Sequence, residues 1–126
     1  MNRVWVRALA FDVALVVVFV LIGRRSHEES GALLGLARTA WPFLAGLAAG
    51  WLVARAWRRP LQLWPGGVVV WLVTVALGMV LRVVSGQGTA FSFVVVTLVV
   101  LAVFLLGWRA LLRVLSRRAA RRPARR

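Results

Sequence analysis

Four long apolar segments set the strongest limit on what this chain of 126 residues can fold into. They cover about residues 4–22, 40–57, 67–84 and 90–108, so each has 18 or 19 residues. A helix of that size is about 27–29 Å long, which matches the hydrocarbon core of a bilayer at about 30 Å. The fourth segment is rich in valine, but its length favours a helix, because only helices and closed barrels satisfy their backbone hydrogen bonds in lipid.

The sequence therefore predicts an all-α fold, an integral membrane four-helix transmembrane bundle. We expect residues 1–108 to form the four-span transmembrane domain and residues 109–126 to form an Arg-rich cytoplasmic tail. The composition agrees with this prediction, since 62% of the residues are hydrophobic and the mean hydropathy is +0.87. A soluble domain of this size has too little interior to bury so much apolar surface.

Arginine is distributed unevenly between the two sides of the predicted bundle. All 17 basic residues are Arg, and they face only 3 acids, for a net charge of +14. Thirteen belong to the N-terminus, the second loop and the C-terminal tail. The four on the other side are Arg24, Arg25, Arg38 and Arg82. By the positive-inside rule we expect both termini in the cytoplasm and a multi-pass protein of the inner (plasma) membrane. The tail is expected to contact anionic headgroups, and no nucleic-acid partner is expected because no folded binding module accompanies the arginines.

The residue types that carry most enzyme chemistry are scarce. The chain has no Cys and one His, which excludes disulfides, thiolate chemistry and Cys-ligated metals and leaves too few ligands for a metal or haem site. No paired acids and no Ser/His arrangement stand out. We therefore expect no metal, no cofactor and no enzymatic activity.

The second span presents a choice of starting points. Ser26-x-x-Glu29 is a capping box that predicts a short interfacial helix from about His27. Pro42 argues against one continuous helix over residues 27–57, and Thr39 is expected to cap the second span and leave Pro42 in its first turn. Tryptophans near the predicted span ends are typical of aromatic belts at the membrane surface. They are Trp41, Trp64, Trp108 and, less regularly placed, Trp5.

Asp12 is the most informative residue, because it lies inside the first span. An Asp in the middle of a spanning helix costs about 2.5–3.5 kcal/mol on insertion, which the apolar residues around it just offset. Such an acid normally faces the bundle interior and has a partner. Three interpretations stay open: a buried pair that fixes helix register, a protonatable or ligand-binding acid, and a residue that snorkels to the surface.

Four residues are candidate partners of Asp12. Arg82 lies about 12 Å further out if the first span begins at Val4. Arg55 and Arg109 are better candidates if that span begins later. Thr74 lies near the level of Asp12 and is a candidate for a hydrogen bond to it.

A second polar cluster marks the outer end of the first span. It holds Arg24, Arg25 and His27, followed by Glu28 and Glu29. One His with two Arg suits anion binding or titration near neutral pH. The alternative is a solvated polar loop.

The second span also contains Gly46 and Gly50, a small-xxx-small spacing that lets two helix backbones approach closely. We expect these glycines to serve helix packing within the bundle, with dimerisation as the alternative.

Several of these positions form a pattern that is similar to a known family. The pattern comprises Asp12, Gly23-Arg24-Arg25-x-His27, Thr39-Ala40-Trp41-Pro42-Phe43, Trp71-x-x-Thr74, Gly78, Arg82, Phe91-x-Phe93 and Gly107-Trp108-Arg109. It resembles a family of uncharacterised small bacterial membrane proteins, catalogued as a domain of unknown function and best known from actinobacteria. The resemblance covers nearly the whole chain and implies four membrane spans, but no activity.

Together these features predict a polytopic inner-membrane protein that acts as a structural or accessory membrane subunit. The alternative is a small proton- or ion-linked transporter or channel that uses Asp12. Expected partners are the lipid bilayer and either further copies of the chain or another membrane protein.

Overall fold

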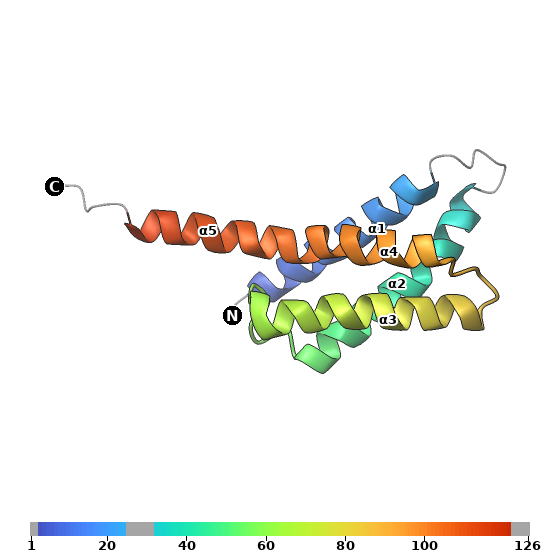
Figure 1. Ribbon diagram of the computed structural model, residues 1–126. Helices are drawn as coiled ribbons and strands as arrows, with labels where there is room; N and C mark the ends of the chain where they lie inside the picture. Colours follow the sequence, from blue (N-terminus) through green and yellow to red (C-terminus); the bar gives the residue numbers. More distant parts are fainter. Residues whose placement is uncertain (1–2, 25–31, 122–126) are drawn as a thin grey trace.

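The computed structural model describes residues 3–24 and 32–121, and every regular element in these ranges is helical (Figure 1). In chain order the elements are α1 (Val4–Arg24), α2 (Ala32–Ala54), the irregular turn η1 (Leu63–Gly67), α3 (Val68–Val84), α4 (Phe91–Leu101), the π-helical turn η2 (Ala102–Leu106) and α5 (Gly107–Arg121). α1 begins and α2 ends at the end of the bundle from which α5 projects, which we call the tail end. α1 ends and α3 gives way to α4 at the opposite end, which we call the loop end.

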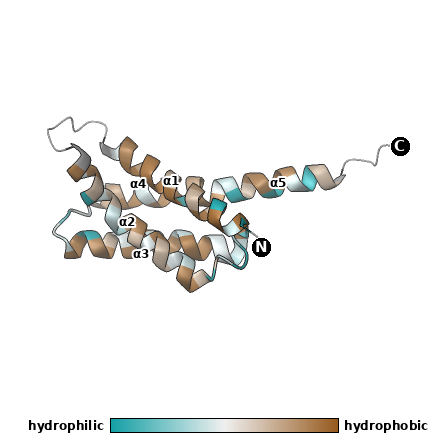
Figure 2. Ribbon diagram, turned by 180° about the vertical axis from the view of Figure 1, so that it is seen from behind, coloured by the Kyte–Doolittle hydropathy of each residue, from teal (hydrophilic) through white to brown (hydrophobic). Residues whose placement is uncertain are grey.

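Among the described residues, four helical stretches are long and apolar enough to cross a membrane: Val4–Gly23, Leu34–Ala54, Leu63–Val84 and Phe91–Ala120. Large apolar side chains are exposed on their outer faces, and Figure 2 shows apolar residues along all four, with hydrophilic residues gathered at the helix ends and on α5. A surface of this kind requires lipid rather than water around it. The predicted all-α, four-span fold is therefore confirmed, and the chain is a multi-pass membrane protein.

α4, η2 and α5 form one continuous helix, which Figure 1 shows extending well past the other three. Its 30 residues from Phe91 to Ala120 correspond to about 45 Å, or about 15 Å more than a hydrocarbon core. All residues from Leu111 to Ala120 are exposed. The Arg-rich tail is thus a straight helical extension, and no helix ends near residue 108.

α2 differs from the prediction, because it begins at Ala32 and contains Pro42 ten residues later. A proline inside a helix leaves the carbonyl four residues earlier without its usual N–H donor. Here that carbonyl belongs to Arg38, and it accepts a hydrogen bond of 3.0 Å from Nε2 of Gln87. A side chain from the turn after α3 replaces the missing backbone donor, so the helix continues through the proline.

Thr39 and Trp41 lie inside α2 for the same reason. The Thr39 hydroxyl donates to the Gly35 carbonyl at 2.9 Å, one turn earlier, so its predicted role as a helix cap is wrong. Trp41 is exposed in the middle of α2 rather than at its start. The expected capping box at Ser26 and Glu29 lies outside the described residues.

α2 ends at a left-handed residue, Arg55, with φ of 52°. The Ala56 N–H donates to the Trp51 carbonyl at 3.0 Å and the Arg55 N–H to the Leu52 carbonyl at 3.3 Å. This is a Schellman ending, which usually has glycine at the left-handed position. α3 ends in the same way with Gly86 there, at φ of 81°.

α2 and α3 make the closest helix–helix contact, and glycines allow it. A Cβ added at Gly46 would lie 2.7 Å from the Thr74 carbonyl oxygen, and one added at Gly50 would lie 3.0 Å from that of Val70. One turn further, a Cβ at Gly78 would lie 2.6 Å from the ring of Phe43. Gly46 and Gly50 thus pack against α3 within the bundle. The α2–α3 contact therefore fixes the position of the tail end relative to the loop end.

Candidate functional site

Asp12 lies on α1 near the tail end and is completely buried, with 0% of its surface exposed. Its Oδ1 accepts hydrogen bonds from Trp108 Nε1 at 2.9 Å and from Arg109 Nη1 at 2.9 Å. Its Oδ2 accepts from Trp51 Nε1 at 2.9 Å and from Arg109 Nη2 at 2.7 Å. A carboxylate offers about four lone-pair sites, so these four donors saturate it.

Arg109 forms the other half of this cluster and is only 1% exposed. It meets Asp12 through both terminal nitrogens, the two-point geometry in which Arg–carboxylate pairs are strongest. Its Nη1 also donates to the Leu105 carbonyl at 2.8 Å, and its Nε donates to the Pro60 carbonyl at 3.0 Å. Arg109 therefore joins α1, the loop after α2 and the α4–α5 helix at one point.

The depth at which the pair meets follows from helix geometry. Asp12 comes eight residues after Val4, or about 12 Å along α1. Helical side chains lean toward the N-terminus of their own helix, so the Arg109 guanidinium lies one turn deeper, beside Leu105. An Arg at the predicted end of the fourth span thus reaches an Asp well inside the first one, although α1 begins at Val4.

Aromatic side chains enclose the pair. The Arg109 guanidinium carbon lies 4.6 Å from the ring centre of Trp108, and Phe11 packs edge-on against that ring at 5.0 Å. Gly67 leaves room for the Arg109 stem, because a Cβ there would lie 3.1 Å from Arg109 Cδ. Every buried side-chain nitrogen and oxygen of the described residues has a hydrogen-bond partner. The cluster is therefore closed, neutral overall and without an unoccupied acceptor for a ligand.

The structure separates the other candidate partners from Asp12. The buried Thr74 hydroxyl donates to the Val70 carbonyl of its own helix at 2.6 Å. Arg55 is exposed where α2 ends. Arg82 lies at the loop end, where its Nε and Nη2 donate to the Gly88 carbonyl at 3.0 and 2.6 Å.

Sequence reasoning missed the indole donors Trp51 and Trp108. Trp108 was expected in an aromatic belt, whereas its N–H is aimed at Asp12. A buried indole N–H needs an acceptor, and Asp12 is the one acid predicted to lie inside a span. The need of a buried indole for an acceptor, together with the single acid inside a span, could have predicted the contact between tryptophan and Asp12.

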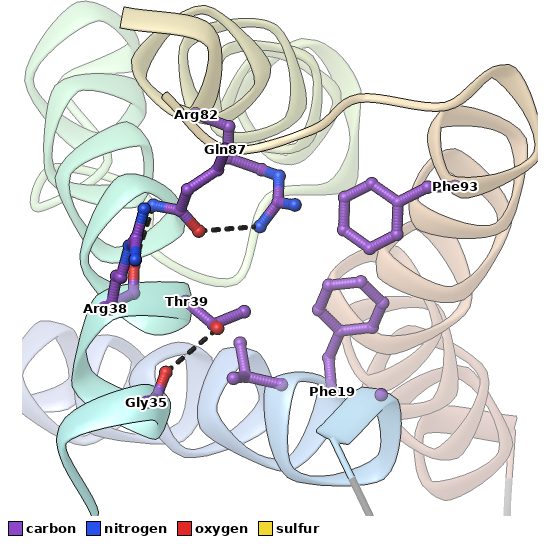
Figure 3. A pocket seen from close by; sticks show the side chains of 9 residues that line it. Phe19, Gly35, Arg38, Thr39, Arg82, Gln87 and Phe93 are labelled. Carbon is purple, nitrogen blue, oxygen red and sulfur yellow. Dashed lines mark hydrogen bonds between the residues drawn. The ribbon is translucent and has the colours of Figure 1, made fainter. Parts of the chain in front are cut away.

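The predicted outer cluster falls mostly outside the described residues. Arg25 and His27, with Glu28 and Glu29, lie there, and Arg24 is described only as the last residue of α1. Next to it the structure has a pocket of about 510 Å³, which Figure 3 shows between α1, α2, α3 and the start of α4. Two of the four arginines that sequence analysis assigned to this side, Arg38 and Arg82, line it.

The two ends of the bundle thus offer different chemistry. The tail end holds a saturated ion pair, and the loop end holds an open pocket with two guanidinium groups. Within residues 3–24 and 32–121, no three side chains of His, Cys, Asp or Glu lie close enough to share a metal ion.

Comparison with known proteins agrees with the sequence pattern. No curated protein and no solved structure is detectably similar to this chain. One family model, described as "Protein of unknown function (DUF3054)", matches residues 9–112, from α1 just before Asp12 into α5 just after Arg109. The expected membership in a family of unknown function is therefore confirmed, and the chain belongs to the DUF3054 family.

Proposed function

We propose that this protein is an accessory subunit of the inner membrane, a rigid bundle that transports no protons and catalyses no reaction. The observation that carries the proposal is the saturated Asp12 carboxylate, with four donors and no exposed surface. Asp12 is the one acid in the described residues, so it is the natural carrier for the transport alternative.

A proton carrier must exchange its proton with each side of the membrane in turn. A proton added to either oxygen of Asp12 would face an N–H donor instead of an acceptor, because donors surround both oxygens. Exchange would also require breaking contacts that join three parts of the chain through Arg109. This geometry suits a fixed contact between helices and does not suit the transfer of a proton.

The long α4–α5 helix supplies a surface for the accessory role. Arg113 and Arg117 lie on one face of α5, with the exposed Leu111 and Leu115 on the opposite face at 100° per residue. Basic side chains next to a membrane span attract anionic headgroups. We infer that α5 anchors the protein on anionic lipid at the cytoplasmic surface and presents its apolar face to a partner protein or to a second copy of the chain.

Orientation is part of the same proposal. The tail end collects the N-terminal arginines, those after α2 and those of α5, which favours the cytoplasm for this end. Reporter fusions at Gly31 and Gly88 are expected to lie outside, and fusions after Arg59 and Arg126 inside. A cytoplasmic signal at Gly31 would overturn this orientation.

Proton flux tests the proposed function directly. The parent protein and Asp12→Asn are reconstituted in vesicles that contain a pH-sensitive dye, and an imposed pH gradient is followed under a potassium diffusion potential. Both proteins are expected to dissipate the gradient no faster than protein-free vesicles. Faster dissipation by the parent that Asp12→Asn abolishes would establish the transport alternative instead.

A further inference from the structure

The described residues that line the pocket at the loop end carry two positive charges and no carboxylate. Its volume is about 510 Å³, and its polar walls come from Arg38 and Thr39 of α2, Arg82 of α3 and Gln87 of the following turn. Neither Asp nor Glu is among the lining residues that the structure describes. Asp12 is occupied at the tail end, and the two remaining acids of the chain, Glu28 and Glu29, lie outside the described residues.

Arg82 is held in place with part of its binding capacity unused. It stacks at 4.6 Å on the ring of Phe93, and its three hydrogen bonds within the described residues go to neutral oxygens of Gln87 and Gly88. A guanidinium group has five N–H donors, so two make no hydrogen bond in the described part of the chain and can serve a ligand. Because its position is fixed before a ligand arrives, little side-chain entropy is lost on binding.

Gln87 links the two arginines and depends on the proline in α2. Its Nε2 donates to the Arg38 carbonyl that Pro42 leaves open, and its Oε1 accepts from Arg82 Nη1 at 3.1 Å. Figure 3 shows Gln87 between the two arginines, with Phe19 and Phe93 across the pocket. The helix irregularity at Pro42 is thus used to orient the amide that positions Arg82.

Arg38 adds an exposed cation on the same wall. It is close enough to Arg82 for the two charges to repel each other, and no hydrogen bond or ion pair of its side chain occurs within the described residues. An anion between two guanidinium groups would relieve that repulsion. Guanidinium groups match phosphate oxygens in geometry, and the apolar ring of Phe19 opposite suits the carbon part of a larger ligand.

We propose that this pocket binds a phosphate-bearing anion, with Arg82 and Arg38 donating to the phosphate oxygens. The phosphate belongs either to the headgroup of an anionic phospholipid or to a free anion, and both sources share this chemistry. The site goes beyond the accessory role proposed above and does not depend on it.

Calorimetric titration of the protein in a neutral detergent tests this site. The titrants are inorganic phosphate, short-chain phosphatidylglycerol and, as a neutral lipid, short-chain phosphatidylcholine, at constant ionic strength. Arg82→Gln and Arg38→Gln are each expected to weaken phosphatidylglycerol or phosphate binding by about 10-fold or more, the size of a lost charged hydrogen bond. Arg58→Gln removes the same charge at the tail end and is expected to leave affinity unchanged.

The two anionic titrants identify the source of the phosphate group. Binding of phosphatidylglycerol alone assigns a lipid headgroup, and binding of phosphate as well, with the same loss in the variants, assigns the phosphate group itself. Arg38→Gln keeps the interpretation independent of folding, because Arg38 is exposed and makes no side-chain hydrogen bond in the described chain. No binding of either anion, equal binding of phosphatidylcholine, or an equal loss in Arg58→Gln would overturn the proposal.

Discussion

Each end of the bundle holds an arginine stacked at 4.6 Å on an aromatic ring, Arg109 on Trp108 and Arg82 on Phe93. Arg109 is buried and paired with a carboxylate, whereas Arg82 is partly exposed and, among the described residues, bonded only to neutral oxygens. The first arrangement ends in a neutral, closed network, and the second leaves a net charge facing a pocket. Arginine thus stabilises the fold at one end and is available for binding at the other. The difference is that Arg109 has a carboxylate partner and Arg82 has none among the described residues.

The largest expected effect separates the two arginines by stability. Arg109→Gln leaves Asp12 buried without its cation, which is expected to lower the free energy of unfolding by about 3–5 kcal/mol. Arg82→Gln removes charged hydrogen bonds from a partly exposed side chain and leaves no buried charge unpaired, so it is expected to cost less, about 1.5–3 kcal/mol. Titration with SDS in mixed micelles measures both variants. Equal losses would erase the distinction between the two ends.

The indole donors provide a finer test of the tail end. Trp51→Phe removes a hydrogen bond to a buried carboxylate and is expected to cost about 1.5–3 kcal/mol. Trp71→Phe is the matched control, because its indole donates to the neutral Leu98 carbonyl at 3.0 Å. The control is expected to cost about 0.5–1.5 kcal/mol. A larger loss in Trp71→Phe than in Trp51→Phe would mean that Asp12 does not depend on its indole donors.

The packing of the bundle between its two ends depends on the α2–α3 contact. Gly46→Ala places a Cβ 2.7 Å from the Thr74 carbonyl oxygen, and the overpacking is expected to cost about 1–3 kcal/mol. Gly107→Ala is the control, because a Cβ there meets nothing within 4 Å and alanine favours the helix. Thermal melting in detergent is expected to fall for the first variant only. Unchanged melting of Gly46→Ala would show that the helices have room to separate.

The smallest expected effect is a gain in stability at the tail end. Arg55→Gly relieves a left-handed residue at the end of α2, which costs an L-residue about 1–2 kcal/mol. Part of that gain is offset by the entropy of glycine, so a net stabilisation of about 0.5–1 kcal/mol is expected. The same SDS titration measures it, and a destabilised variant would indicate that the Arg55 side chain makes a contribution of its own.

How far the sequence could predict this structure depended on the range of the interactions. Span lengths predicted the fold, and the insertion cost of Asp12 predicted that the acid would be buried with a partner. The choice of Arg109 depended on side-chain direction and on how α1 packs, which apolar periodicity does not encode. The continuation of α2 through Pro42 depended on Gln87, 45 residues away in sequence. No local sequence pattern predicts such a contact.

The missed loop-end pocket has the same explanation. Arg38 and Arg82 were placed on one side of the membrane by their order along the chain, and that order says nothing about which helices are neighbours. Their convergence on one pocket required the α2–α3 contact and the turn after α3. Residues that a single helix brings together were predictable, and residues joined across helices were not.

The central claim is that Asp12 and Arg109 form one buried ion pair that joins the helices and stabilises the fold. A double-mutant cycle tests this claim most directly. Asp12→Leu and Arg109→Leu are each expected to lower the free energy of unfolding by about 3–5 kcal/mol, because each leaves a buried charge unpaired. The double variant removes both charges and is expected to lose far less than the sum of the two. Additive losses, or an Asp12→Leu protein as stable as the parent, would contradict the claim.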